Sequence, residues 1–109
     1  MADVRAASLG DVASDRPTPA ELDGVRVVLA RVGDRVYALA GTCAHRGGPL
    51  GEGKLSGTRL ACPWHGWIYD VRTGQCAFPG RGEAVASYGV RVDGDDVWVR
   101  LPDASEGQR

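Results

Sequence analysis

The chain has 109 residues, of which 43% are hydrophobic and 25% charged, and this is the size and composition of one globular domain. Its formal net charge of −1 predicts no nucleic-acid partner and no affinity for an anionic membrane surface. We find no apolar run near the roughly 20 residues of a membrane span, and the start "MADVRAASLGDV" lacks the features of a secretory signal, so we expect a cytoplasmic protein.

Alternation of apolar and polar residues dominates the chain, and helix signals are nearly absent. We expect an edge strand at "VRAA" (4–7), then a turn or a single helical turn at "SLGDV" (8–12). Residues 14–22, "SDRPTPAEL", read as an exposed connector. A hairpin follows over 25–40, in which "VRVVLARV" and "RVYALA" are joined by the two-residue turn "GD".

The second half of the chain repeats this pattern with shorter segments. "KL" and "TRLACP" flank the turn Ser56-Gly57, and "WIYDV" (67–71) precedes the turn "RTGQ". A closing hairpin joins "YGVRV" (88–92) to "VWVRL" (97–101) through "DGDD", whose acidic residues are explained by solvation at a hairpin tip. Sixteen glycines also favour a turn-rich fold.

We therefore predict a single all-β domain over residues 1–109, an antiparallel β sandwich or barrel. Residues 41–80 form an inserted subdomain, residues 3–40 and 81–101 form the base, and residues 102–109 form a flexible tail.

Two short stretches, Cys43-Ala-His45 and Cys62-Pro-Trp-His65, contain both histidines of the protein. Two thiolates and two imidazoles suit zinc or an iron–sulfur cluster. Zinc fingers usually present a cysteine pair first and a histidine pair later, whereas each stretch here offers one cysteine and one histidine. This order favours a [2Fe–2S] cluster, with both cysteines on one iron and both histidines on the other.

These stretches resemble the Rieske [2Fe–2S] family. "CAHRGGPL" matches its box C-x-H-x-G-x-x-L, "CPWHGWIYD" matches C-P-x-H-G-x-x-[FY]-D, and the similarity covers roughly residues 3–101. The resemblance implies one [2Fe–2S] cluster held by Cys43 and Cys62 on the inner iron and by His45 and His65 on the exposed iron. It also implies loop and supporting residues around the cluster: Gly47, Gly48, Pro63, Trp64, Gly66, Trp67 and Tyr69.

Differences within the family bear on the potential of the cluster. Quinol-oxidising members carry a serine that bonds a bridging sulfide where this chain has Trp67, and a disulfide between loops where it has Gly48 and Trp64. Tyr69, which donates to a cysteine sulfur in those members, is retained. The resemblance therefore implies a low-potential Rieske ferredoxin, without catalytic residues of its own. Such a protein passes electrons from a flavin-dependent reductase to a terminal non-haem iron oxygenase, and we expect it to be a monomer.

Several residues have competing interpretations. Arg46, Trp64 and Pro79 are candidates for a docking face, but Trp64 also suits plain packing and Pro79 a simple turn. We interpret Trp67 as a packing residue and Cys76 as a buried thiol outside the ligand set. "GPLGEGKL" nearly spells a phosphate-binding loop, but Leu55 replaces the required hydroxyl residue and no long helix follows.

Three other functions compete with the electron carrier. A terminal oxygenase needs a mononuclear iron site made of two histidines and one carboxylate. Both histidines of this chain are already assigned to the cluster, so none is left for such a site. The small subunit of an assimilatory nitrite reductase shares the fold but often lacks the four ligands. A zinc-stabilised interaction module would use the same four residues, and metal content distinguishes it.

Overall fold

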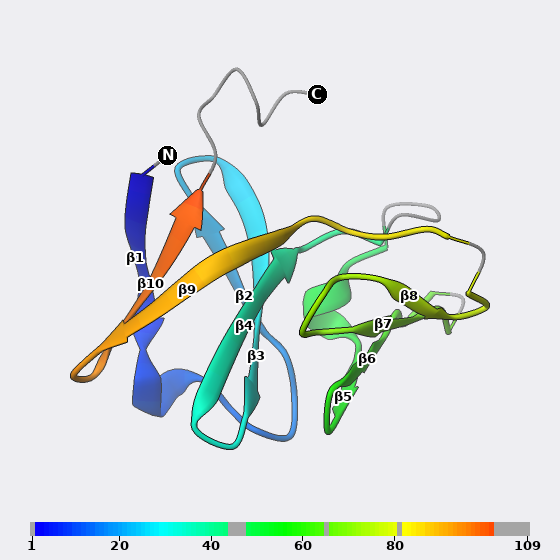
Figure 1. Ribbon diagram of the computed structural model, residues 1–109, viewed down its shortest axis with the longest axis horizontal. Helices are drawn as coiled ribbons and strands as arrows, with labels where there is room; N and C mark the ends of the chain where they lie inside the picture. Colours follow the sequence, from blue (N-terminus) through cyan, green and yellow to red (C-terminus); the bar gives the residue numbers. More distant parts are fainter. Residues whose placement is uncertain (1, 44–47, 65, 81, 102–109) are drawn as a thin grey trace.

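The computed structural model describes residues 2–43, 48–64, 66–80 and 82–101, and Figure 1 shows their arrangement. Six antiparallel strands form the larger sheet in the order β1-β10-β9-β4-β3-β2. Its strands are β1 (Ala2–Ser8), β2 (Thr18–Leu22), β3 (Val25–Val32), β4 (Arg35–Ala40), β9 (Ser87–Asp93) and β10 (Asp96–Leu101). The all-β prediction is confirmed.

The smaller sheet lies to one side of the larger one, at the right in Figure 1, and has the order β5-β6-β7-β8. Its strands are β5 (Lys54–Ser56), β6 (Arg59–Ala61), β7 (Ile68–Asp70) and β8 (Cys76–Phe78). This sheet falls within the predicted subdomain 41–80, whose boundaries stay a prediction. Strand β8 was not predicted.

Both predicted hairpins are present. β3 and β4 pair with Val32 opposite Arg35, so their turn has two residues, as predicted. β9 and β10 pair with Asp93 opposite Asp96, so the closing hairpin has a two-residue tip rather than the predicted four-residue one. β1 is an edge strand, as predicted, and the 3₁₀ helix η1 (Leu9–Asp11) follows it.

The prediction of an exposed connector over residues 14–22 is wrong at its C-terminal end, because β2 is a strand with Leu22 buried. Asp23 and Gly24 both have positive φ angles, 51° and 81°. Two such residues make the turn that returns a strand directly onto its neighbour, and β2 accordingly pairs with β3 from Leu22–Val25 onward. Pro19 is compatible with this strand because β2 lies at the edge of the sheet.

Strand β3 separates two hydrophobic cores. Successive side chains of a strand point to opposite faces. Val27 and Leu29 belong to a core enclosed by the larger sheet, together with Val97 and Val99 of β10. Their neighbours on β3 belong to a second core, which the smaller sheet covers and which contains the three cysteines. The buried residues of this second core are Val28, Ala30, Leu39, Cys43, Leu50, Leu55, Leu60, Cys62, Tyr69, Val71, Cys76 and Val85. The second core thereby joins the two sheets.

The two helices of the described residues, η1 and η2 (Leu50–Glu52), are three residues long each. Neither is long and apolar enough to cross a membrane.

The turn between β7 and β8 is organised by Asp70. Its carboxylate accepts hydrogen bonds from the backbone N–H and the guanidinium of Arg72 at 2.9–3.1 Å, and its carbonyl accepts from the N–H groups of Thr73 and Gly74. The Arg72 side-chain hydrogen bond holds the pKa of the Asp70 carboxyl below its usual value of 3.8. The pair therefore contributes stability above pH 4 that is lost as the pH falls through the lowered pKa.

We expect the substitution Arg72→Ala to return the pKa of Asp70 toward 3.8 and to remove this pH-dependent contribution. Because both side chains are near the surface, the loss of stability is small. NMR titration of the Asp70 carboxyl carbon measures the pKa, and urea unfolding at pH 7 and at pH 2 measures the stability. An unchanged pKa of Asp70 in the variant would contradict the assignment to Arg72.

Candidate metal centre

Two loops of the structure begin at a cysteine and are closed in the same way. In the first loop the backbone N–H of Cys43 donates to the carbonyl of Gly48 at 2.8 Å. In the second loop the N–H of Cys62 donates to the carbonyl of Trp67 at 2.7 Å. In both cases the acceptor lies five residues after the cysteine, so the two cysteines occupy equivalent positions. Each loop therefore presents its cysteine from a backbone that is fixed at both ends.

Secondary structure anchors both loops. The first connects β4 to η2, and an isolated bridge pairs Thr42 with Pro49 across its base. The second connects β6 to β7, where Ala61 pairs with Ile68. The larger sheet thus leads into the first loop, and the smaller sheet carries the second.

The sulfur atoms of both loops face the core. Cys43 is 5% exposed and Cys62 is 3% exposed, and the three cysteines of the chain form no disulfide. The hydroxyl of the fully buried Tyr69 lies 3.1 Å from Cys43 Sγ, at hydrogen-bonding distance. A buried tyrosine hydroxyl needs such a partner, and toward a metal-bound thiolate it is the donor.

Gly48 lies where the two loops meet. A Cβ atom at this position would be 2.8 Å from Cys62 Sγ and 3.1–3.2 Å from the indole atoms Cδ2 and Cγ of Trp64. The buried Cα of Gly48 therefore packs against both the sulfur and the ring. Any side chain at residue 48 would displace one of them.

The other predicted residues of the second loop lie nearer the surface. Pro63 and Trp64 are exposed, Trp64 by 56%, and the exposed Gly66 donates its N–H to the carbonyl of Cys62 at 3.0 Å. Trp67 is half-buried and packs against the core that contains both cysteines.

The segment after β8 emerges at the same end of the smaller sheet as the second loop, because Ile68 pairs with both Ala61 and Phe78. Pro79 is partly buried, and the preceding Phe78 is 61% exposed. The sequence interpretation did not single out Phe78, since no local signal separates an exposed aromatic residue from a buried one.

Four predicted site residues lie outside the described residues: the ligand candidates His45 and His65, the docking candidate Arg46, and Gly47. Among residues 2–43, 48–64, 66–80 and 82–101, no three His, Cys, Asp or Glu side chains form a metal-binding group. The described part of the site is thus the pair Cys43 and Cys62. Cys76 is buried too, but its Sγ donates to the carbonyl of Phe78 at 3.0 Å.

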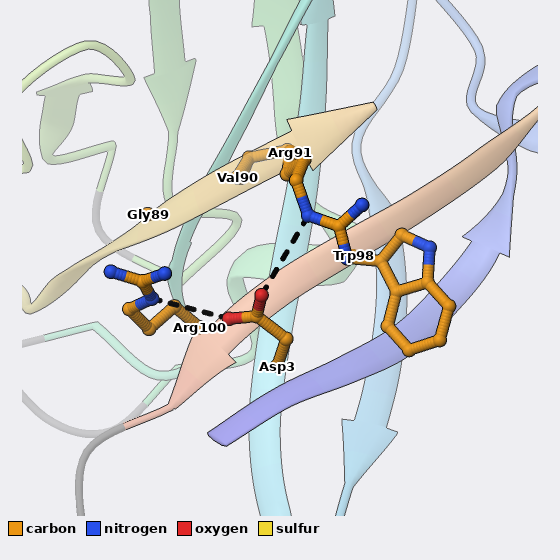
Figure 2. Close-up of a pocket in the computed structure, with 6 residues that line it drawn as sticks. All are labelled: Asp3, Gly89, Val90, Arg91, Trp98 and Arg100. Carbon is orange, nitrogen blue, oxygen red and sulfur yellow. Dashed lines mark hydrogen bonds and ion pairs between the residues drawn. The ribbon is translucent and has the colours of Figure 1, made fainter. Parts of the chain in front are cut away.

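A surface hollow of about 250 Å³ lies on another part of the molecule, on the outer face of β1, β9 and β10 (Figure 2). Its charges are paired with one another. Asp3 accepts from Arg100 Nε at 3.1 Å and lies 3.7 Å from Arg91 Nε. The guanidinium of Arg91 stacks on Trp98, 5.3 Å from the ring centroid. We interpret this hollow as a cross-strand network that stabilises the sheet.

The described residues fit a cluster that takes thiolate ligands. Soft sulfur donors select zinc or iron–sulfur clusters, and both sulfurs belong to loops held by backbone hydrogen bonds. Because Gly48 has no side chain, its Cα can lie close to Cys62 Sγ, where a Cβ atom would come within 2.8 Å of the sulfur. Tyr69 adds a hydrogen-bond partner for the other sulfur.

Comparison with known proteins agrees with this donor set. A family model described as Rieske [2Fe-2S] domain matches residues 3–89. Ferredoxin CarAc of Metapseudomonas resinovorans is 38% identical over 73 residues, which are 67% of this chain and 68% of that protein.

Larger proteins also match. Methylxanthine N1-demethylase NdmA of Pseudomonas putida is 34% identical over 92 residues, 78% of this chain but 26% of the demethylase. The chain thus spans about a quarter of the length of this relative. Among solved structures, the ferredoxin of carbazole 1,9a-dioxygenase from Nocardioides aromaticivorans IC177 superposes with a TM-score of 0.83 at 35% identity, covering 91% of this chain and 97% of that one.

Proposed function

The chain belongs to the Rieske [2Fe-2S] family, and from this premise we propose that it carries single electrons to a terminal non-haem iron oxygenase. One observation supports this most directly: two loops closed in the same way each present a buried cysteine, Cys43 and Cys62. In each loop the sequence places a histidine two or three residues further on.

Within this proposal Cys43 and Cys62 hold the inner iron of the cluster, and His45 and His65 hold the outer one. The [2Fe–2S] group, when bound, accepts and returns one electron at a potential that its ligands and their hydrogen bonds tune. The chain's own residues orient the sulfurs and exclude water from them. Tyr69 offers a direct contact for tuning, since its hydroxyl lies 3.1 Å from Cys43 Sγ.

The histidines of these 109 residues fit an electron-carrying domain better than the active site of an oxygenase. The 109 residues contain two histidines, and both stand in the ligand motifs. An oxygenase active site needs two further histidines for its mononuclear iron. The similar ferredoxin from Nocardioides aromaticivorans IC177 is that of carbazole 1,9a-dioxygenase. By analogy we propose a flavoprotein reductase as donor, a terminal oxygenase as acceptor, and a cytoplasmic location.

An EPR-monitored redox titration of the purified protein at several pH values tests the proposal. A rhombic Rieske signal on reduction, with a negative potential that is constant through neutral pH, is the expected result. A positive and strongly pH-dependent potential would contradict the low-potential carrier. Zinc in place of iron in the metal analysis would favour the interaction module, and lack of transfer to any oxygenase would favour the nitrite reductase subunit.

We expect Tyr69→Phe to lower the reduction potential while the protein keeps its cluster. The lost hydroxyl stabilises the sulfur more when reduction has added negative charge, so its removal disfavours the reduced state. If the hydrogen bond is about 1 kcal/mol stronger in the reduced state than in the oxidised state, its loss lowers the potential of this one-electron couple by roughly 40 mV. The same EPR titration measures the shift. A potential equal to that of the unmodified protein would show that this contact does not tune the cluster.

A further inference from the structure

Trp64 is the largest exposed side chain of the second loop, yet its ring is held against the first loop. The ideal Cβ position of Gly48 lies 3.1 Å from Trp64 Cδ2 and 2.8 Å from Cys62 Sγ. The indole and the sulfur, both from the second loop, therefore both lie close to Gly48 of the first loop. Although Trp64 is 56% exposed, Cys62, two residues before it, is 3% exposed.

We propose that Trp64, packed on the bare Cα of Gly48, is a clasp between loops 43–48 and 62–67 that keeps water and chelators from the Cys62 sulfur. The proposal rests on the ligand role given to Cys62 above, and it makes Trp64 a positioning residue. An indole offers a large rigid surface for such a contact.

Shielding of this sulfur has a chemical consequence. Chelators remove the metal from sites of this kind, and to do so they must reach the bond between the metal and its ligand. Burial of Cys62, which is 3% exposed, keeps them from its sulfur. A side chain that closes the gap between the loops therefore slows the loss of the cluster without touching the iron.

The rate at which excess EDTA bleaches the visible absorption of the intact, cluster-loaded protein tests the clasp. We expect Trp64→Ala to bleach about tenfold faster, in line with other residues that support metal ligands. Trp64→Phe, which keeps an aromatic ring on Gly48, should stay near the rate of the unmodified protein. Val92→Ala, which shortens another exposed hydrophobic residue on β9, is the matched control and should not change the rate.

A second pair of variants tests the contact itself. In Gly48→Ala the new methyl group must displace the ring or the sulfur, so bleaching should also accelerate. If the clasp exists, both substitutions disrupt the same contact. The bleaching rate of the double variant Gly48→Ala/Trp64→Ala should then rise by less than the product of the two single-variant increases. Independent, multiplicative effects would overturn the proposal.

Other outcomes are equally decisive. If Trp64→Ala bleaches at the rate of the unmodified protein, the clasp is wrong, and a docking role for this residue remains the better interpretation. If the unmodified protein shows no Rieske EPR signal, the ligand role of Cys62 fails first, and with it the premise of the clasp. The signal of the unmodified protein thus separates the two failures.

Discussion

Cys43→Ser and Cys62→Ser are each expected to lose nearly all of the [2Fe–2S] cluster. Serine replaces a soft thiolate with a hard oxygen that iron–sulfur clusters accept poorly. The two cysteines occupy equivalent positions in loops closed by equivalent hydrogen bonds, so we expect the two losses to be similar. Iron and sulfide content per folded chain measures the effect, with circular dichroism to establish that the variants fold.

Cys76→Ser is the matched control for these variants. Cys76 is buried like the other two cysteines and belongs to the same core, but its Sγ donates to the carbonyl of Phe78. A serine hydroxyl can donate to the same carbonyl, so we expect the cluster content to be unchanged. Loss of the cluster from Cys76→Ser with retention in Cys43→Ser would overturn the ligand assignment.

The largest effect on stability is expected from Leu39→Ala. Leu39 on β4 is fully buried in the core that joins the two sheets. Its Cδ2 atom reaches the turn between β7 and β8, where it lies 3.6 Å from the ideal Cβ position of Gly74. Truncation of such a leucine removes apolar contacts and leaves a cavity, at a cost of about 2–5 kcal/mol. That is a large part of the roughly 5–15 kcal/mol that stabilises a typical domain.

Urea unfolding at neutral pH, followed by tryptophan fluorescence with the cluster present, measures this change. Val92→Ala is the control again, since Val92 is 40% exposed and a surface substitution should alter the free energy of unfolding by no more than about 0.5 kcal/mol. If the two variants unfold at the same urea concentration, Leu39 does not join the sheets as described.

Much of the larger sheet could be predicted because its signals are local. The alternation in "VRVVLARV" and "RVYALA" and the two-residue turn between them predicted β3 and β4 with their observed bounds. The missed strand β2 had a local signal as well, the dipeptide Asp23-Gly24, whose positive φ angles start the hairpin.

By itself, the sequence predicted the ligand chemistry: the types and spacing of Cys43, His45, Cys62 and His65 favour a two-iron cluster. The assignment of these four residues as its ligands stays a prediction. Only the tertiary structure decided which of the predicted surrounding residues contacts which cysteine. Tyr69 reaches Cys43, and Gly48 reaches both Cys62 and Trp64. These contacts join segments that are distant in sequence, and they exist because the pairing of β6 with β7 and the shared core bring the two loops together. No local preference of a residue contains that information.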